Sequence, residues 1–236
     1  MSPTPRRAAA EPASETVRLD GVGFGYADSP DVLRDINLIL PRGSFHFLTG
    51  PSGAGKSSLL RLLTLAERPT TGRIALFGED ATQIDRDAIP LYRRRMGVVF
   101  QDFRLLDHLS LFDNAALPLR LAGRKRAAYA PDVEEMLRWV GLDARPSARP
   151  SALSGGEKQR LAIARAVMNK PELIIADEPT GSVDRAMADR LLKLFQSLNR
   201  LGATVLIASH DEALAERSGA RRLRLENGRL IGGGAQ

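Results

Sequence analysis

The chain has 236 residues, enough for one sizeable α/β domain with a proper core and too few for two ordinary domains. It contains no cysteine and no run of about 18 apolar residues, which excludes disulfide bonds and thiolate metal sites and argues against a membrane-spanning helix. The formal net charge of +6 favours anionic partners, although charge alone does not distinguish a nucleotide from a nucleic acid or an anionic membrane surface.

The N-terminal region combines a polar segment with several predicted strands. Residues 1–16 are rich in Ala, Pro, Ser, Glu and Arg without periodicity, and they predict a disordered tail. No apolar segment follows the arginines of this tail, so we expect a soluble, cytoplasmic protein. Alternating apolar and polar residues predict antiparallel strands over 17–26 and 32–40. A short strand over 44–48, a glycine-rich turn and a helix over 57–67 follow.

The middle of the chain changes from strands to helices. Apolar runs predict strands over 72–77 and 96–100. From about residue 105 to residue 150 the apolar residues recur at helical spacing, with proline and glycine between the periodic segments. We interpret this stretch as a helical subdomain inserted into the larger domain.

The C-terminal part of the chain alternates helices and strands. Helices are predicted over 156–168 and 187–201, and the apolar runs at 173–176 and 205–208 are typical of buried parallel strands. Alternating strands and helices indicate a parallel sheet with both faces covered. We therefore expect one α/β domain over 17–236, with a parallel-sheet core, an antiparallel β subdomain and the inserted helices.

Residues 50–57 match the phosphate-binding pattern G-x-x-x-x-G-K-[ST] and lie between a predicted strand and a predicted helix, as this motif requires. Glycines let successive backbone N–H groups turn toward phosphates at a helix N-terminus. Lys56 supplies a positive charge toward the β- and γ-phosphates, and the Ser57 hydroxyl is a ligand for Mg²⁺. The predicted nucleotide-binding residues of this loop are Gly50, Pro51, Ser52, Gly53, Ala54, Gly55, Lys56, Ser57 and Ser58.

Two adjacent carboxylates, Asp177 and Glu178, follow the buried strand over 173–176. Neighbouring residues on an extended strand point to opposite sides, so the two acids must have different tasks. We predict that Asp177 belongs to the Mg²⁺ shell and that Glu178 polarises the attacking water.

The sequence Leu-Ser-Gly-Gly-Glu at 153–157 opens the predicted helix over 156–168 and distinguishes this chain from other phosphate-loop enzymes. Here the chain resembles the ABC ATPase family. A serine hydroxyl, glycine N–H groups and a helix dipole suit an anion that arrives from outside. In the family, this anion is the γ-phosphate of ATP bound to the opposite subunit, so the resemblance implies a RecA-like core, a homodimer, and ligand contacts from Ser154, Gly155 and Gly156.

The resemblance extends from about residue 17 to residue 229 and assigns roles to four further residues. It implies that Tyr26 stacks on adenine, and that Gln101 senses Mg²⁺ and the water. It also implies that His210 is the switch histidine near the γ-phosphate and that Asp184 belongs to the loop that communicates between the two sites. The chain departs from the commonest family pattern at Ser58, Lys158, Ser182 and Val183. None of these is assigned a catalytic or metal-binding role, and only Ser58 belongs to the predicted nucleotide-binding residues. His46 and His108 are interpreted as structural.

Within the family, segments at 93–102, 105–119 and 164–171 resemble most the ATPases that transmit force to an integral membrane partner in cell division. The resemblance implies a peripheral protein at the cytoplasmic face of the inner membrane, whose partner controls cell-wall hydrolases. An ATPase subunit of a lipoprotein-releasing or macrolide-type exporter is the alternative. A partner helix is expected in a groove after Gln101, and the candidate residues for contact are Phe103, Leu105, Leu106, Leu111 and Phe112, each of which has core packing as an equal alternative.

Three clusters of basic residues, at 93–95, 124–126 and 221–222, lie in polar surroundings without interleaved aromatic residues. This composition weakens the case for single-stranded nucleic acid as a ligand. A soluble ATPase acting on ribosomes or DNA is disfavoured as well, because the chain has one cassette and no sustained heptads. We interpret the clusters as solvated faces, with membrane proximity as the alternative, and expect no nucleic-acid partner.

Overall fold

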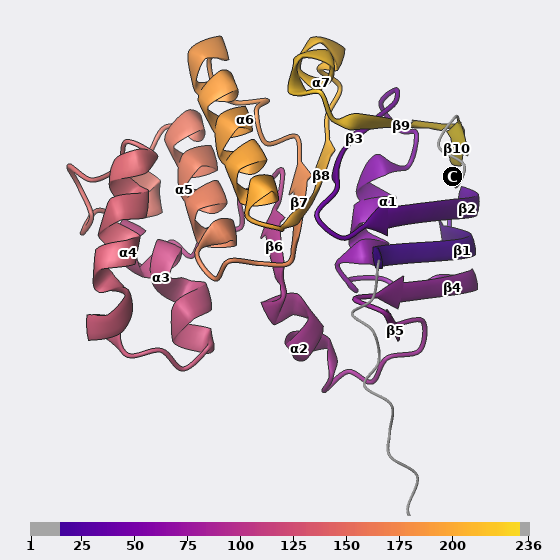
Figure 1. Cartoon of the computed structure of the whole chain (residues 1–236), viewed down its shortest axis with the longest axis horizontal. Helices are drawn as coiled ribbons and strands as arrows, with labels where there is room; N and C mark the ends of the chain where they lie inside the picture. The colour runs from indigo at the N-terminus through magenta and orange to yellow at the C-terminus, as the bar shows by residue number, and fades with distance from the viewer. Residues whose placement is uncertain (1–14, 232–236) are drawn as a thin grey trace, which may run out of the picture.

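The computed structural model describes residues 15–231 (Figure 1). Residues 1–14 of the predicted tail lie outside this range. Its last two residues belong to strand β1 (Glu15–Tyr26), so the domain begins two residues earlier than the predicted boundary. Thr16 is buried, and its hydroxyl lies 2.7 Å from that of Thr204, which anchors the start of the strand.

An antiparallel sheet forms one end of the molecule, as the alternating pattern predicts. It contains β1, β2 (Ser29–Pro41), β4 (Thr71–Leu76) and β5 (Glu79–Asp80), in the order β2-β1-β4-β5. Tyr26 at the end of β1 pairs with Ser29 at the start of β2, so the two long strands are joined by a tight turn. Tyr26 therefore lies at the turn end of the β1-β2 hairpin.

A second sheet is mostly parallel and has the order β10-β9-β3-β8-β7-β6. Four of its parallel strands, β3, β6, β7 and β8, were expected from apolar runs. The fifth, β9, was not predicted from the sequence. The last strand, β10, pairs antiparallel with β9 and was also missed. The strands are β3 (Phe45–Thr49), β6 (Met96–Val99), β7 (Leu173–Asp177), β8 (Thr204–Ala208), β9 (Arg221–Glu226) and β10 (Arg229–Ile231).

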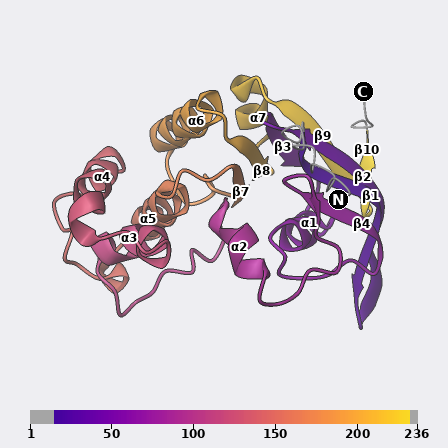
Figure 2. The ribbon, with the colours of Figure 1, turned by 60° about the horizontal axis from the view of Figure 1, so that its bottom comes forward.

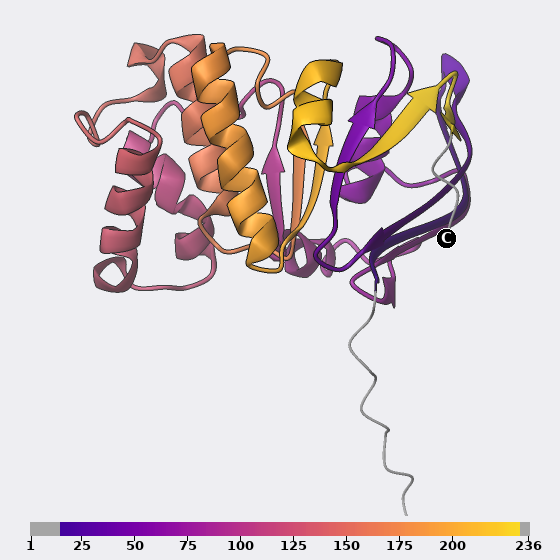
Figure 3. The ribbon, with the colours of Figure 1, turned by 45° about the horizontal axis from the view of Figure 1, so that its top comes forward.

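Helices cover both faces of the parallel strands. Leu173 and Ile175 of β7 belong to the core that contains α1 (Lys56–Leu63), whereas Ile174 and Ala176 belong to the core on the other face. That second core is covered by α5 (Gly155–Val167) and α6 (Arg185–Arg200), and Figure 3 shows α6 lying along the strands. This confirms the predicted parallel sheet with covered faces.

Helix α1 ends at Leu63, four residues before the predicted end. Leu65 has a φ of 55°, and the N–H groups of Ala66 and Glu67 both donate to the carbonyl oxygen of Arg61. A residue in the left-handed region stops helix propagation, and the looser hydrogen bonds close the last turn. Apolar spacing alone therefore overestimated the length of this helix.

The helical part of the chain lies at the end opposite the antiparallel sheet (Figures 1 and 2). It contains α3 (Leu111–Leu121), α4 (Arg126–Trp139) and the short 3₁₀ helix η1 (Pro150–Ala152). Buried residues of α3 and α4 share one apolar core with residues of α5. Two short helices complete the fold: α2 (Ile89–Arg94) and α7 (Glu212–Ser218). Within residues 15–231, no helix has both the length and the apolar character needed to cross a membrane.

His46 is a buried histidine in β3, and the structure predicts a pH effect from it. Burial, and to a smaller extent the charge of Arg221, lowers the pKa of His46 from 6.5 to about 4. The unfolded chain therefore binds this proton more readily, and stability present above pH 6.5 is lost as the pH falls toward 4, by about 3 kcal/mol at most. We expect His46→Leu to flatten the pH dependence of the unfolding free energy in this window, measured by urea denaturation. The exposed His108→Asn serves as the control, and an identical pH slope for the parent and His46→Leu would contradict the prediction.

Candidate functional site

The predicted phosphate loop connects β3 to α1, and its glycines adopt conformations that other residues avoid. Gly50, Gly53 and Gly55 have φ values of 146°, 78° and 103°. A Cβ at Gly50 would lie 2.1 Å from the carbonyl oxygen of Leu225, so a larger residue does not fit there. Gly55 is the N-cap of helix α1 and provides no side-chain cap, which leaves the first N–H groups of the helix directed toward the loop.

The side chain of Lys56 folds back over this loop. Its Nζ donates to the carbonyl oxygens of Gly50 at 2.7 Å and Pro51 at 3.0 Å. Pro51, Ser52 and Gly53 are exposed, so the outer part of the loop is open to a ligand. A lysine ammonium group beside the uncapped N-terminus of a helix is an arrangement that binds phosphate.

Ser57 and Asp177 lie together, as expected for a shared metal ion. The Ser57 hydroxyl donates to Oδ2 of Asp177 at 2.9 Å, and both residues line a cavity of about 510 Å³ together with Gln101. Burial raises the pKa of the Asp177 carboxyl, and the Glu178 charge adds to this effect, whereas the hydrogen bond from Ser57 and the charge of Lys56 oppose it. A half-buried carboxylate beside a hydroxyl and an amide oxygen fits Mg²⁺, which prefers oxygen ligands and balances such a charge.

Glu178 leaves the strand geometry immediately after Asp177. It has a φ of 50°, and its N–H donates to the carbonyl oxygen of Ala208 at 2.9 Å. The side chain of Glu178 is 16% exposed, and its Oε1 lies 2.9 Å from Nδ1 of His210. The Ser209 hydroxyl donates to Oε2 at 3.3 Å. The parallel pairing of β7 with β8 thus brings Glu178 and His210 together at the ends of the two strands.

Ser209 is a site residue that the sequence analysis missed. It is buried, and besides its bond to Glu178 its hydroxyl accepts from the N–H of Asp211 at 3.1 Å. In the sequence, the only indication of a role for Ser209 was its position next to His210. Its contact with Glu178 depends on the pairing of β7 with β8, which the sequence does not show.

Tyr26 stands beside the phosphate loop. Its ring is 40% exposed and packs edge-to-face on Phe24, with the centroids 4.9 Å apart. Its hydroxyl lies 3.3 Å from Oγ of Ser58, the buried serine that follows Ser57. An exposed ring at this place fits the predicted stacking on adenine. Ser58, which was predicted to bind the nucleotide, is buried, and its hydroxyl contacts that of Tyr26.

The Leu-Ser-Gly-Gly-Glu segment forms the N-terminus of α5, held by a capping box. Oγ of Ser154 accepts from the N–H of Glu157 at 3.3 Å, and the Glu157 carboxylate accepts from the N–H of Ser154 at 2.8 Å. Arg145, a residue not identified from the sequence, pairs with Glu157 at 2.6 Å. The hydrogen bond from the N–H of Ser154 is the main cause of the lowered pKa of Glu157. The charged carboxylate of Glu157 is therefore the form that holds the segment. Ser154 and Gly155 remain exposed.

The structure does not bring this segment to the phosphate loop of the same chain. Helix α5 covers the face of the parallel strands opposite α1. A Cβ at Gly156 would lie 3.0 Å from the carbonyl oxygen of Ser182, so the loop before Asp184 packs on the Leu-Ser-Gly-Gly-Glu segment instead. Asp184 itself caps α6 by accepting from the N–H of Met187 at 2.9 Å. The predicted residues therefore form two half-sites, one around Lys56 and one around Ser154.

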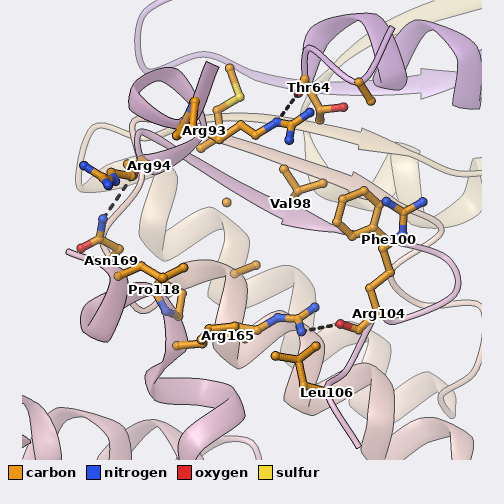
Figure 4. A pocket seen from close by; sticks show the side chains of 17 residues that line it. Thr64, Arg93, Arg94, Val98, Phe100, Arg104, Leu106, Pro118, Arg165 and Asn169 are labelled. Atoms are coloured by element: carbon orange, nitrogen blue, oxygen red, sulfur yellow. Dashed lines mark hydrogen bonds between the residues drawn. The ribbon is translucent and has the colours of Figure 1, made fainter. Parts of the chain in front are cut away.

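A groove of about 570 Å³, here called the arginine groove, lies between α2, β6, α3 and α5 (Figure 4). Among residues 15–231, its walls carry four arginines and several apolar residues and no Asp or Glu. Of the predicted docking residues, only Leu106 lines this groove. For Leu111 and Phe112 the structure shows the alternative, core packing, because both are buried in the core shared by α3, α4 and α5. The groove arginines are Arg93, Arg94, Arg104 and Arg165.

Comparison with known proteins identifies the family of this chain. A family model described as ABC transporter matches residues 33–181. The chain is 42% identical over 217 residues to the cell division ATP-binding protein FtsE of Escherichia coli strain K12, with 92% of the chain and 98% of the relative covered. It is 41% identical over 216 residues to FtsE of Mycobacterium tuberculosis, with 91% and 94% covered.

Solved structures give the same answer. A dimeric ATP-binding cassette in a post-hydrolysis state, bound to ADP and Pi, matches with a TM-score of 0.86 and 32% identity, covering 91% of this chain and 96% of that one. The predicted α/β fold of a phosphate-loop ATPase is thereby confirmed. Because the family model covers more than half of the chain and the relatives match over nearly its whole length, this chain belongs to the ABC transporter family of ATP-binding subunits and is an ATPase.

Proposed function

We propose that this chain is the ATP-binding and hydrolysing subunit of an FtsEX-like complex. Closure of a homodimer on ATP drives an FtsX-type membrane protein that regulates cell-wall hydrolases during division, and the chain acts at the cytoplasmic face of the inner membrane. The observation that carries this proposal is the similarity to FtsE of Escherichia coli, which extends over 92% of the chain and 98% of the relative. FtsE of Bacillus subtilis is 36% identical over 215 residues.

The residues around the phosphate loop bind the nucleotide and Mg²⁺. Lys56 and the backbone N–H groups of the loop hold the phosphates, and Tyr26 stacks on adenine. Ser57, Asp177 and Gln101 hold Mg²⁺, which neutralises charge on the β- and γ-phosphates when bound. The hydrogen bond between Ser57 and Asp177 supports this assignment, because it already places two of the oxygen ligands together.

Glu178 is the general base of the reaction. Its carboxylate accepts a proton from the water that attacks the γ-phosphorus, while the bond from that phosphorus to the leaving ADP oxygen breaks. His210 and Ser209 orient the carboxylate from two sides, which the distances of 2.9 Å and 3.3 Å support. A base held in this way needs little reorganisation when the water arrives.

The two half-sites require a second copy of the chain. Ser154, Gly155 and Gly156 stay exposed or half-buried at the start of α5, on the other side of the parallel strands from Lys56. In a homodimer, the Leu-Ser-Gly-Gly-Glu segment of one copy faces the phosphates bound by the other, and each copy supplies both halves. The likeness to a dimeric cassette supports this arrangement.

The arginine groove receives a cytoplasmic helix of the membrane partner. Leu121 lines the groove and is 64% exposed, and Leu91 next to the groove is 58% exposed. Exposed apolar residues beside positive charge are suited to an amphipathic helix with acidic side chains. Within the described chain, Arg94 forms no ion pair and is free to meet such a carboxylate.

The proposal is tested by purifying tagged Glu178→Gln protein with ATP from gently solubilised native membranes and identifying the integral membrane protein that accompanies it. An FtsX-type protein supports the division role. A lipoprotein-releasing or macrolide-type permease contradicts it and establishes the exporter alternative, with the nucleotide site unchanged. Recovery of no membrane protein in the presence of ATP also contradicts the proposal.

Arg94→Glu, introduced into the same tagged protein, is expected to reduce recovery of the membrane partner by about tenfold, since it puts a like charge against the expected acidic helix. Arg73→Glu, at an exposed arginine of β4 in the antiparallel sheet, is the matched control and should leave recovery unchanged. ATP binding is measured in parallel for both variants. Equal recovery with Arg94→Glu and Arg73→Glu would show that the arginine groove is not the docking surface.

A further inference from the structure

One short turn separates the arginine groove from the cavity that holds the predicted Mg²⁺ ligands. The N–H of Phe103 donates to the carbonyl oxygen of Phe100 at 3.1 Å, which closes a turn with Gln101 and Asp102 at its centre. Phe100 and Arg104 line both cavities, whereas Gln101 lines only the one that contains Ser57 and Asp177. Anything that fixes this turn therefore fixes Gln101 relative to the metal ligands.

Arg165 of α5 holds the end of this turn. Its Nη1 donates to the carbonyl oxygen of Arg104 at 2.6 Å, and its Nη2 donates to that of Phe103 at 2.8 Å. Figure 4 shows its side chain reaching across the arginine groove to the backbone at Arg104. The planar guanidinium, with its donors in a fixed fork, can engage both carbonyl groups at once.

The two residues that Arg165 holds have an unfavourable backbone conformation. Phe103 and Arg104 have φ values of 59° and 46°, and consecutive left-handed residues other than glycine require support from their surroundings. The other contacts of Arg104, an ion pair with Asp102 at 3.2 Å and stacking over Phe100 at 3.9 Å, lie at the surface. The half-buried Arg165 provides the contact from the interior.

Arg165 itself has no carboxylate partner among the described residues. Burial lowers the pKa of its guanidinium, which nevertheless stays protonated, so a half-buried cation is satisfied only by backbone carbonyl groups. Backbone carbonyl groups orient the guanidinium but do not neutralise its charge. We therefore expect Arg165 to serve by holding the two carbonyl groups in place.

We propose that Arg165 is a positioning residue that sets Gln101 at the Mg²⁺ site by clamping the backbone of Phe103 and Arg104. The inference rests on the metal site of the proposed function.

The test uses the full-length chain and mant-ATP, a fluorescent ATP analogue, titrated over a range of Mg²⁺ concentrations and in EDTA. Arg165→Met is expected to raise the Mg²⁺ concentration for half-maximal enhancement of binding by about tenfold, while binding in EDTA stays at the parental level. Arg165→Lys, whose ammonium cannot bridge both carbonyl groups, should give an intermediate value. Arg68→Met is the matched control, because Arg68 also donates to a backbone carbonyl, that of Ile84 at 2.8 Å, away from Gln101.

The outcomes separate this inference from the proposed function. If Arg165→Met has the same Mg²⁺ dependence as the parental chain, the inference is overturned and the proposed function is unaffected. Equal losses with Mg²⁺ and in EDTA also overturn it, because they indicate a general structural role. A parental chain whose binding does not depend on Mg²⁺ contradicts the metal site itself. If Arg165→Met does not fold, Arg165→Lys decides, and a parental Mg²⁺ midpoint for that variant overturns the inference.

Discussion

Glu178→Gln is expected to lower kcat for ATP hydrolysis by about 10²- to 10⁴-fold while leaving ATP binding intact. The amide has nearly the same size and still accepts the hydrogen bond from Ser209, so the backbone and the bound nucleotide should be undisturbed. It cannot accept a proton from water, and the reaction loses its base. The dimer closed on ATP should therefore accumulate, which size-exclusion chromatography with ATP measures directly.

Glu134→Gln, at an exposed glutamate of α4, is the control for replacing a carboxylate by an amide, and we expect it to keep the parental rate and the parental elution volume. Binding is compared with mant-ATP for both variants. Hydrolysis by Glu178→Gln at the parental rate would remove Glu178 from the role of base. His210 lies 2.9 Å from the same carboxylate and would then be the next residue to test.

The parts of the site that could be predicted are those encoded by neighbouring residues. The phosphate loop, the Asp177-Glu178 pair and the Leu-Ser-Gly-Gly-Glu segment each occupy a few consecutive positions, and each depends on one strand end or one helix start. The contacts that orient these groups were not predicted. Ser209 reaches Glu178 across 31 positions, and Arg165 reaches Phe103 across 62. Such pairs become visible only when the order of the strands and helices is known.

The errors in the fold have similar causes. Strand β9 consists mainly of arginine and leucine, and only Leu223 and Leu225 are buried, so its basic residues suggested a solvated face and concealed the alternation. Leu111 and Phe112 were considered for docking because they follow Gln101 and are apolar. Sequence gives the apolar character of a helix, but it does not say whether that face meets its own core or a partner, and α4 and α5 cover both residues.

Lys56→Ala is expected to weaken ATP binding by about 100-fold or more, equivalent to roughly 3 kcal/mol, because the triphosphate loses the cation that balances its charge. Mant-ATP titration measures the loss. The native Nζ also donates to Gly50 and Pro51, but the loop lies at the surface, so the melting temperature should change little. Lys193→Ala, at an exposed lysine of α6, controls for removal of a positive charge and should bind as the parent does. Parental affinity in Lys56→Ala would contradict the assignment of this loop to the phosphates. A large loss of affinity with an unchanged melting temperature would show that Lys56 serves the ligand more than the fold, which is the opposite of what a structural glycine-rich turn with a chance lysine predicts.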